Sequence, residues 1–136
     1  MGSRKRLSAE ATKKVKQKVS FAHLRNCPTS PRKMRLAAGL VRGIPVENAI
    51  HILKNSPLEA SSRLHKLLLS AVANWQAKNE GVRIEDANLV VKEVSVDSAR
   101  MLKRIRTAPQ GRAYRVRKRS NHVTLIVDSL KNDKKA

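Results

Sequence analysis

The sequence predicts an α+β fold with three helices, strands near both ends of the chain and one long, basic β-hairpin. Three observations lead to this prediction. Apolar residues recur with helical spacing through residues 30–79, and they alternate with the period of a strand in 19–25 and again from Leu89 onwards. Between the later alternating runs, residues 100–119 hold nine basic residues and no acidic one.

The composition predicts a single cytosolic domain with a polyanionic partner. The 136 residues carry a formal charge of +20 and only three aromatic side chains, so neither an aromatic-lined pocket nor a base-stacking sheet is expected. One cysteine excludes an internal disulfide and suits a reducing compartment, and no apolar run approaches the ~20 residues of a membrane span. The charge is +11 over residues 1–45, −1 over 46–97 and +10 over 98–136. Because a solubilising surface mixes its signs, both flanks are expected to bind a polyanion.

Residues 19–130 are expected to form one globular α+β domain with an appendage at each end. The basic arm at 1–18 has few large apolar residues, so we expect it to be largely disordered in the free protein. The tail at 131–136 is expected to fray. The domain begins with a strand over 19–25, where Val19, Phe21 and His23 alternate with Ser20, Ala22 and Leu24.

Three helices follow this strand. The first helix begins at Ser30, whose hydroxyl can cap free backbone donors, and Pro31 suits its first position. Gly43 can adopt the left-handed conformation that ends a helix. The second, short helix repeats the apolar spacing over 46–53, and the third starts at a Ser-Pro-Leu-Glu capping box at 56–59. The apolar stripe of the third helix is expected to be core, and it comprises Leu64, Leu67, Leu68, Ala71, Val72 and Trp75.

From Leu89 the apolar period changes to two. Val90, Val94 and Val96 are predicted to share one strand face, although the residues on either side of Val90 indicate burial on both faces where the strand begins. The last strand alternates over 123–127. Together these segments predict two strands joined by the basic run.

The basic run predicts a β-hairpin over about 97–118 with its tip near 107–111. Pro109 presets the first corner of a type I turn, and Gly111 suits the point where the chain leaves it. Each arm of about ten residues reaches roughly 30 Å, whereas a body of about ninety residues has a radius of gyration of ~12 Å, so the hairpin must protrude. Its charges repel one another, and arginine outnumbers lysine seven to two. We therefore expect a nucleic acid that contacts both faces to order it.

No catalytic or cofactor site is predicted. The four histidines are scattered, the single cysteine provides no zinc pattern, and the sequence lacks a glycine-rich phosphate loop. Ser30 and Ser56 are explained as caps, and Cys27 is expected to be a small buried residue. We therefore expect a protein that is not an enzyme and holds no metal or cofactor.

Two stretches of the sequence resemble one family closely. SPRKMRLAAGLVRG (30–43) resembles the first helix of bacterial large-subunit ribosomal protein twenty-two. LKRIR (102–106) and GRAYRVRKRSNHVTLIV (111–127) resemble that family's hairpin and closing strand. The order and spacing match from about residue 19 to residue 127, which is most of the chain.

The resemblance implies three helices packed on a small antiparallel β-sheet, with one long protruding basic β-hairpin. It implies a cytoplasmic, structural constituent of the large ribosomal subunit that binds large-subunit RNA and supports early subunit assembly. The body would lie near the exit of the peptide tunnel and the hairpin along the tunnel wall, in contact with neighbouring ribosomal proteins and the nascent peptide, without membrane contact or homo-oligomer. By position, the RNA-binding residues would be Arg25, Arg32, Lys33, Arg35, Arg42, Arg100, Lys103, Arg104, Arg106, Arg112, Arg115, Arg117, Lys118, Arg119 and His122.

The hairpin tip departs from the family pattern. The tunnel-facing tip implied by the resemblance comprises Thr107, Ala108, Pro109, Gln110 and Gly111. Two charges that are common there in relatives are missing, and Asn121 stands where serine is common. The resemblance therefore extends to the fold and the hairpin arms, but not to the contacts of the tip.

Three other classes of protein fit the basic composition. A DNA-architectural protein with a β-ribbon arm often carries a proline near its tip, but it acts as a dimer, and this sequence shows no spare apolar helix face. An RNA chaperone without a fixed site is the second class. A cationic membrane-surface protein is the third, and it is disfavoured because the basic flanks lack an amphipathic apolar face.

Overall fold

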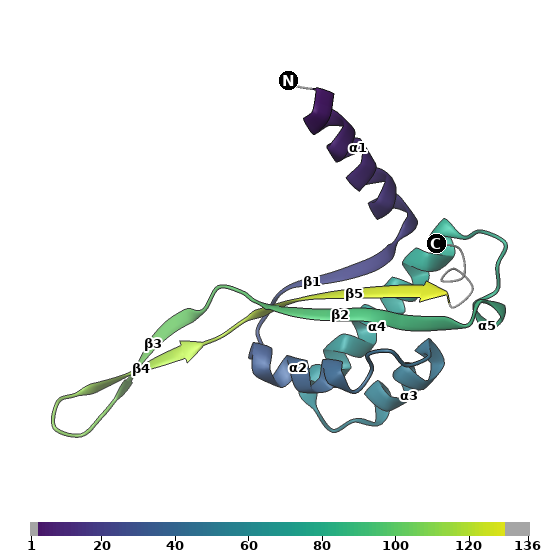
Figure 1. Ribbon diagram of the computed structural model, residues 1–136. Helices are drawn as coiled ribbons and strands as arrows, with labels where there is room; N and C mark the ends of the chain where they lie inside the picture. The colour runs from purple at the N-terminus through teal and green to yellow at the C-terminus, as the bar shows by residue number, and fades with distance from the viewer. Residues whose placement is uncertain (1–2, 130–136) are drawn as a thin grey trace.

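The computed structural model describes residues 3–129, and the predicted tail at 131–136 lies outside the described residues. A three-stranded antiparallel sheet organises the body, formed by β1 (Ser20–Cys27), β2 (Leu89–Ser98) and β5 (Asn121–Ser129). The strand order is β1-β5-β2, so β5 lies at the centre. Helices lie against one side of this sheet (Figure 1), which confirms the predicted α+β class.

Helices α2 (Pro31–Gly39), α3 (Val46–Asn55) and α4 (Glu59–Lys78) pack on the sheet (Figure 1). Their apolar faces and the inward side chains of the strands form one core. The apolar stripe predicted for α4 is confirmed, because all six of its residues are buried. In β5 the predicted alternation is also confirmed, since its buried side chains are separated by half-buried ones over 121–127.

The described chain has five helices rather than the three predicted. The helix α5 (Ile84–Ala87) is a single turn before β2, and α1 (Ser3–Lys18) occupies the stretch expected to be disordered. This stretch lacks glycine and proline and is rich in Lys, Arg and Ala, which are strong helix formers. Arg6 Nε lies 3.6 Å from Glu10 Oε1 one turn later, which adds local support. Helix propensity explains why α1, which projects from the start of β1 (Figure 1), differs from the expected arm.

The helices begin close to the predicted positions, but the Ser30 cap and the reciprocal bonds of the capping box are not formed in the described part of the chain. Ser30 precedes α2 and Pro31 is its first residue, yet the Ser30 side chain makes no cap hydrogen bond. Ser56 Oγ instead accepts hydrogen bonds from the Leu58 N–H at 3.4 Å and from Ser61 Oγ at 2.9 Å. Glu59 pairs with Arg63 at 2.8 Å. Ser61 and Arg63, both inside α4, therefore bind the two side chains that the capping box would have used.

A β-bulge in β2 changes which residues face the core. The pairing of β2 with β5 shifts register between Val91 and Glu93. Leu89 and Val91 before the bulge are buried, as is Val94 after it, whereas Val90 is half-buried. The predicted shared face is therefore wrong at Val90, because an extra residue in one strand reverses the alternation.

Two further strands, β3 (Leu102–Thr107) and β4 (Ala113–Lys118), pair with each other as an antiparallel ribbon outside the main sheet. The ribbon extends away from the body beyond the ends of β2 and β5 (Figure 1). At its tip, Gln110 and Gly111 have φ values of 61° and 68°, and the next N–H donates to the Pro109 carbonyl at 3.4 Å. These are the features of a primed turn, whose twist matches that of the strands. The predicted type I turn is therefore wrong, since Pro109 precedes both corner residues.

Candidate nucleic-acid interface

The register of β3 and β4 distributes the basic side chains over both faces of the ribbon. Directly paired residues share a face, and the faces alternate along each strand. The first ribbon face comprises Leu102, Arg104, Arg106, Tyr114, Val116 and Lys118. The second ribbon face comprises Lys103, Ile105, Thr107, Ala113, Arg115 and Arg117. Each face presents three cations, so an anionic partner can bind the ribbon from both sides.

The cations of the ribbon have no acidic partner within residues 3–129. The ion pairs of this part of the chain lie in α1, in α4 and between β2 and β5. Every cation of β3 and β4 is exposed. Lys103 and Arg117 lie directly opposite each other, so like charges repel across the second ribbon face. The ribbon therefore lacks internal charge compensation, and it suits a partner rich in phosphate.

Apolar and aromatic side chains lie between these cations without being buried. Ile105 is 78% exposed and Tyr114 is 63% exposed. Tyr114 lies opposite Arg106 on the first ribbon face. Nucleic acid matches this mixture, because its bases stack on planar groups and its phosphates pair with guanidinium groups.

Two arginines predicted to bind RNA are engaged within the protein. The strand β2 lies at an edge of the sheet, so carbonyls on its outer side lack a strand partner. Arg35 donates to the Val96 carbonyl at 3.0 Å, and Arg42 donates to the Val94 carbonyl at 2.8 Å. These bonds connect α2 and the segment after it to β2. Each guanidinium has five N–H donors, so further donors remain for a phosphate.

The other predicted site residues lie along the ribbon or close to its root. Arg32 and Lys33 are exposed in the first turn of α2. His122 lies where β5 begins, and its Nδ1 accepts a hydrogen bond from the Asn26 N–H at 3.0 Å. The remaining predicted residues outside the two strands are all exposed, and they are Arg25, Arg100, Arg112 and Arg119.

The structure adds a cationic surface that the sequence analysis did not include among the binding residues. Six bases of α1 are exposed on one continuous helix. The helix propensity of this stretch indicates a helix, but its charge and its lack of large apolar residues favour the disorder that was predicted. These residues are Arg4, Lys5, Arg6, Lys13, Lys14 and Lys16.

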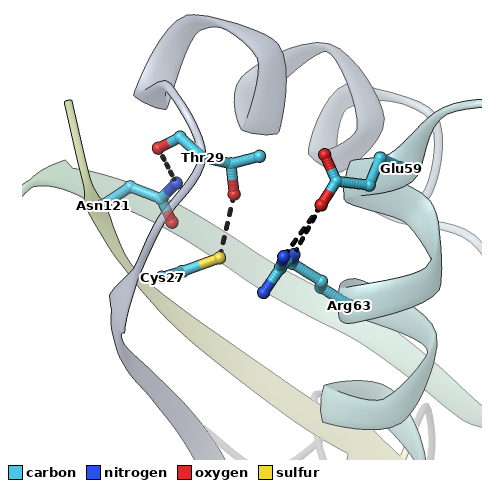
Figure 2. A network of polar contacts seen from close by, with 5 residues as sticks. All are labelled: Cys27, Thr29, Glu59, Arg63 and Asn121. Carbon is cyan, nitrogen blue, oxygen red and sulfur yellow. Dashed lines mark hydrogen bonds and ion pairs between the residues drawn. The ribbon is translucent and has the colours of Figure 1, made fainter. Parts of the chain in front are cut away.

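A buried polar network connects the root of the ribbon to the start of α2 (Figure 2). Asn121 is fully buried, and its Nδ2 donates to the Thr29 carbonyl at 2.6 Å. Cys27 is buried as predicted, with its Sγ 2.9 Å from Thr29 Oγ1. Arg63 donates to Glu59 at 2.8 Å, and this bond, together with the nearby Cys27, raises the pKa of the guanidinium. The Asn121–Thr29 bond connects the first residue of β5 to the segment that leads into α2.

The fold and this surface fit one class, that of small structural proteins whose exposed basic ribbon suits a nucleic-acid partner. In residues 3–129 no group of three or more metal-binding side chains is present. None of the helices described is long and apolar enough to cross a membrane. The family model for ribosomal protein L22p/L17e matches residues 22–128, and the chain belongs to this family.

Similar proteins match the chain over nearly its full length. The large ribosomal subunit protein uL22 of Christiangramia forsetii is 64% identical over 132 residues, which cover 97% of this chain and 98% of that protein. The proteins of the same name from Flavobacterium psychrophilum and Porphyromonas gingivalis are 57% and 58% identical. Their alignments cover 97% and 98% of this chain, and 96% and 98% of the respective relatives.

The family assignment confirms the resemblance carried by the SPRK helix and the hairpin sequence. The chain is a structural protein of the large ribosomal subunit and not an enzyme. In bacteria this subunit lies in the cytoplasm. The basic surface described above therefore belongs to a protein that associates with a ribonucleoprotein particle.

Proposed function

We propose that the chain binds large-subunit ribosomal RNA through the β3–β4 ribbon, with the body near the exit of the peptide tunnel and the ribbon along the tunnel wall. One observation carries this proposal: the ribbon has cations on both faces and no ion pair within residues 3–129. A flat anionic surface would contact only one face. RNA folded around the ribbon contacts both, and it supplies phosphates and bases together.

The same contacts support a role in early subunit assembly. RNA segments on opposite sides of the ribbon are held together by one protein element, because each face carries its own cations. The uncharged tip at 107–111 then faces the nascent peptide, and surfaces of the body that RNA leaves open contact neighbouring ribosomal proteins. The alternative for the ribbon itself is a DNA-architectural or RNA-chaperone mode of binding, since proteins of those classes also use a basic ribbon.

The chain is expected to co-sediment with large ribosomal subunits after a high-salt wash. Several phosphate contacts and an enclosed ribbon together slow its release, whereas binding through scattered charges falls steeply with salt. A variant in which a short turn replaces residues 102–118 is the control, and we expect the wash to remove it. Removal of the intact chain, with equal affinity for large-subunit RNA and random duplex DNA, would favour the chaperone alternative. A stable dimer in gel filtration would favour the DNA-architectural one.

Hydrogen exchange on the isolated protein is expected to separate the ribbon from the core. Residues 58–78 should be protected, because α4 carries the buried apolar stripe. Residues 100–117 should show little protection, because an exposed two-stranded ribbon with repelling charges opens readily. Protection of both segments in the free protein would contradict ordering of the ribbon by RNA.

A further inference from the structure

The face of the sheet opposite to α2, α3 and α4 has a hollow beside the root of the ribbon. Alternation along β1 and β5 places His23 and Thr124 on this face, between residues that are turned into the core. The hollow has a volume of about 520 Å³ and is lined by residues 23–26 and 122–124. The hollow is shallow and open to solvent, so it suits a ligand that stays partly exposed.

His122 lines this hollow, and one of its ring nitrogens is held by the backbone. Its Nδ1 accepts the Asn26 N–H at 3.0 Å, so Nδ1 carries no proton. The proton of the neutral ring is therefore on Nε2, which makes no hydrogen bond within the described chain. This nitrogen is a donor that an anion or a base edge can use.

His23 provides a planar ring whose orientation is held from two sides. Its Nδ1 lies 2.9 Å from Thr124 Oγ1. Its ring centroid lies 5.0 Å from that of Phe21, with the ring planes inclined at 52°. The ring of His23 is exposed nevertheless, so one side of it can accept a stacked planar ligand.

Arg25 adds a cation, and the lining residues include no carboxylate. The site therefore combines a stacking ring, a guanidinium and an N–H donor. A nucleotide needs this combination, with a ring for its base and donors for its phosphate. Only three residues of the sequence are Phe, Trp or Tyr, but His23 supplies the ring here.

We propose that this hollow binds one unpaired nucleotide of the large-subunit RNA, with its base stacked on His23 and its phosphate held by Arg25 and His122. The proposal rests on the proposed function for the source of the nucleotide. The position of the hollow supports RNA rather than a free nucleotide, because His122 lies only three residues after the last cation of the acid-free basic segment. RNA that follows the ribbon toward the body reaches this face.

The test compares two double variants of the full chain in binding to large-subunit RNA at one salt concentration. His23→Ala/Arg25→Ala removes a ring and a cation from the hollow. His51→Ala/Lys54→Ala is the matched control, because it removes an exposed histidine and an exposed lysine from α3. We expect the first variant to bind about tenfold to a hundredfold more weakly, since stacking and one phosphate contact are lost. The control should stay within about twofold of the wild type.

A further variant separates stacking from a general loss of contacts. His23→Phe with Arg25 intact keeps a ring, so its affinity should stay within a few-fold of the wild type. Chemical probing of unpaired bases should show one nucleotide that the wild type protects and the His23→Ala/Arg25→Ala variant leaves reactive. Equal binding and equal protection for the two double variants would overturn the site while RNA binding itself stands.

A titration with adenosine 5′-monophosphate tests the hollow apart from ribosomal RNA. Amide chemical shifts should change in residues 23–26 and 122–124, and inorganic phosphate alone should cause smaller changes. Changes confined to the ribbon would overturn the site. If the wild type does not prefer large-subunit RNA but these shifts occur, the proposed function fails and the nucleotide site stands.

Discussion

Replacing Arg115, Arg117 and Arg119 by alanine together is expected to flatten the salt dependence of RNA binding by about two to three units of slope in log affinity against log salt. Each phosphate contact contributes about −0.7 to −0.9 to this slope, and all three side chains are exposed without an acidic partner in residues 3–129. At physiological salt this loss corresponds to roughly a hundredfold weaker binding. The measurement is a salt titration of affinity for large-subunit RNA.

Two controls make this result specific. A variant that loses the same charge from the helical half of the body, Lys54, Lys66 and Arg83 to alanine, should leave the slope nearly unchanged. Deletion of the uncharged tip at 107–110 should also leave it unchanged, and its effect should instead appear in passage of the nascent chain or in macrolide sensitivity. A tip deletion that flattens the slope as much as the arginine variant would refute phosphate anchoring by the arms.

Leu68→Ala is expected to lower the free energy of unfolding by about 2–5 kcal/mol. Leu68 is fully buried in the middle of the α4 stripe, so the substitution leaves a cavity between the helices and the sheet. This loss is a large share of the ~5–15 kcal/mol that stabilises a domain. Denaturant titration of the full chain measures it.

Leu69→Ala provides the matched control, since the neighbouring side chain is 45% exposed. Its cost should stay near about 0.5 kcal/mol, the range of ordinary surface substitutions. If both variants lose the same free energy, α4 does not pack as described. The three-helix packing would then have to be revised.

The elements that the sequence predicts best are those whose pattern is local and repeated. The stripe of α4 and the alternation of β5 follow directly from buried side chains at regular spacing. The bulge in β2 could not be predicted, because it depends on how β2 pairs with β5 rather than on its own residues. The hydrogen bond between Ser56 and Ser61 could not be predicted either, because it depends on the geometry of α4.

In the candidate site, too, some features can be predicted from the sequence, and others depend on how distant segments pack. The charge of the ribbon is a property of sequence, but the assignment of its cations to two faces requires the register of β3 and β4. The bonds from Arg35 and Arg42 to β2 carbonyls depend on β2 being an edge strand, which the order of elements does not reveal. The hollow at His23 and His122 joins residues about one hundred positions apart, so no local pattern indicates it.

The central place of β5 has a consequence for how the protein is made. During synthesis β1 and β2 emerge before the strand that lies between them, so neither can complete its sheet pairing until residues 121–129 follow. The helices can form earlier, but the buried side chains Val123, Leu125 and Val127 that complete the core arrive last. A copy that stops after the ribbon therefore has every cation of β3 and β4 and no folded body to position them. The sheet from which the ribbon projects is therefore complete only after β5 has been synthesised.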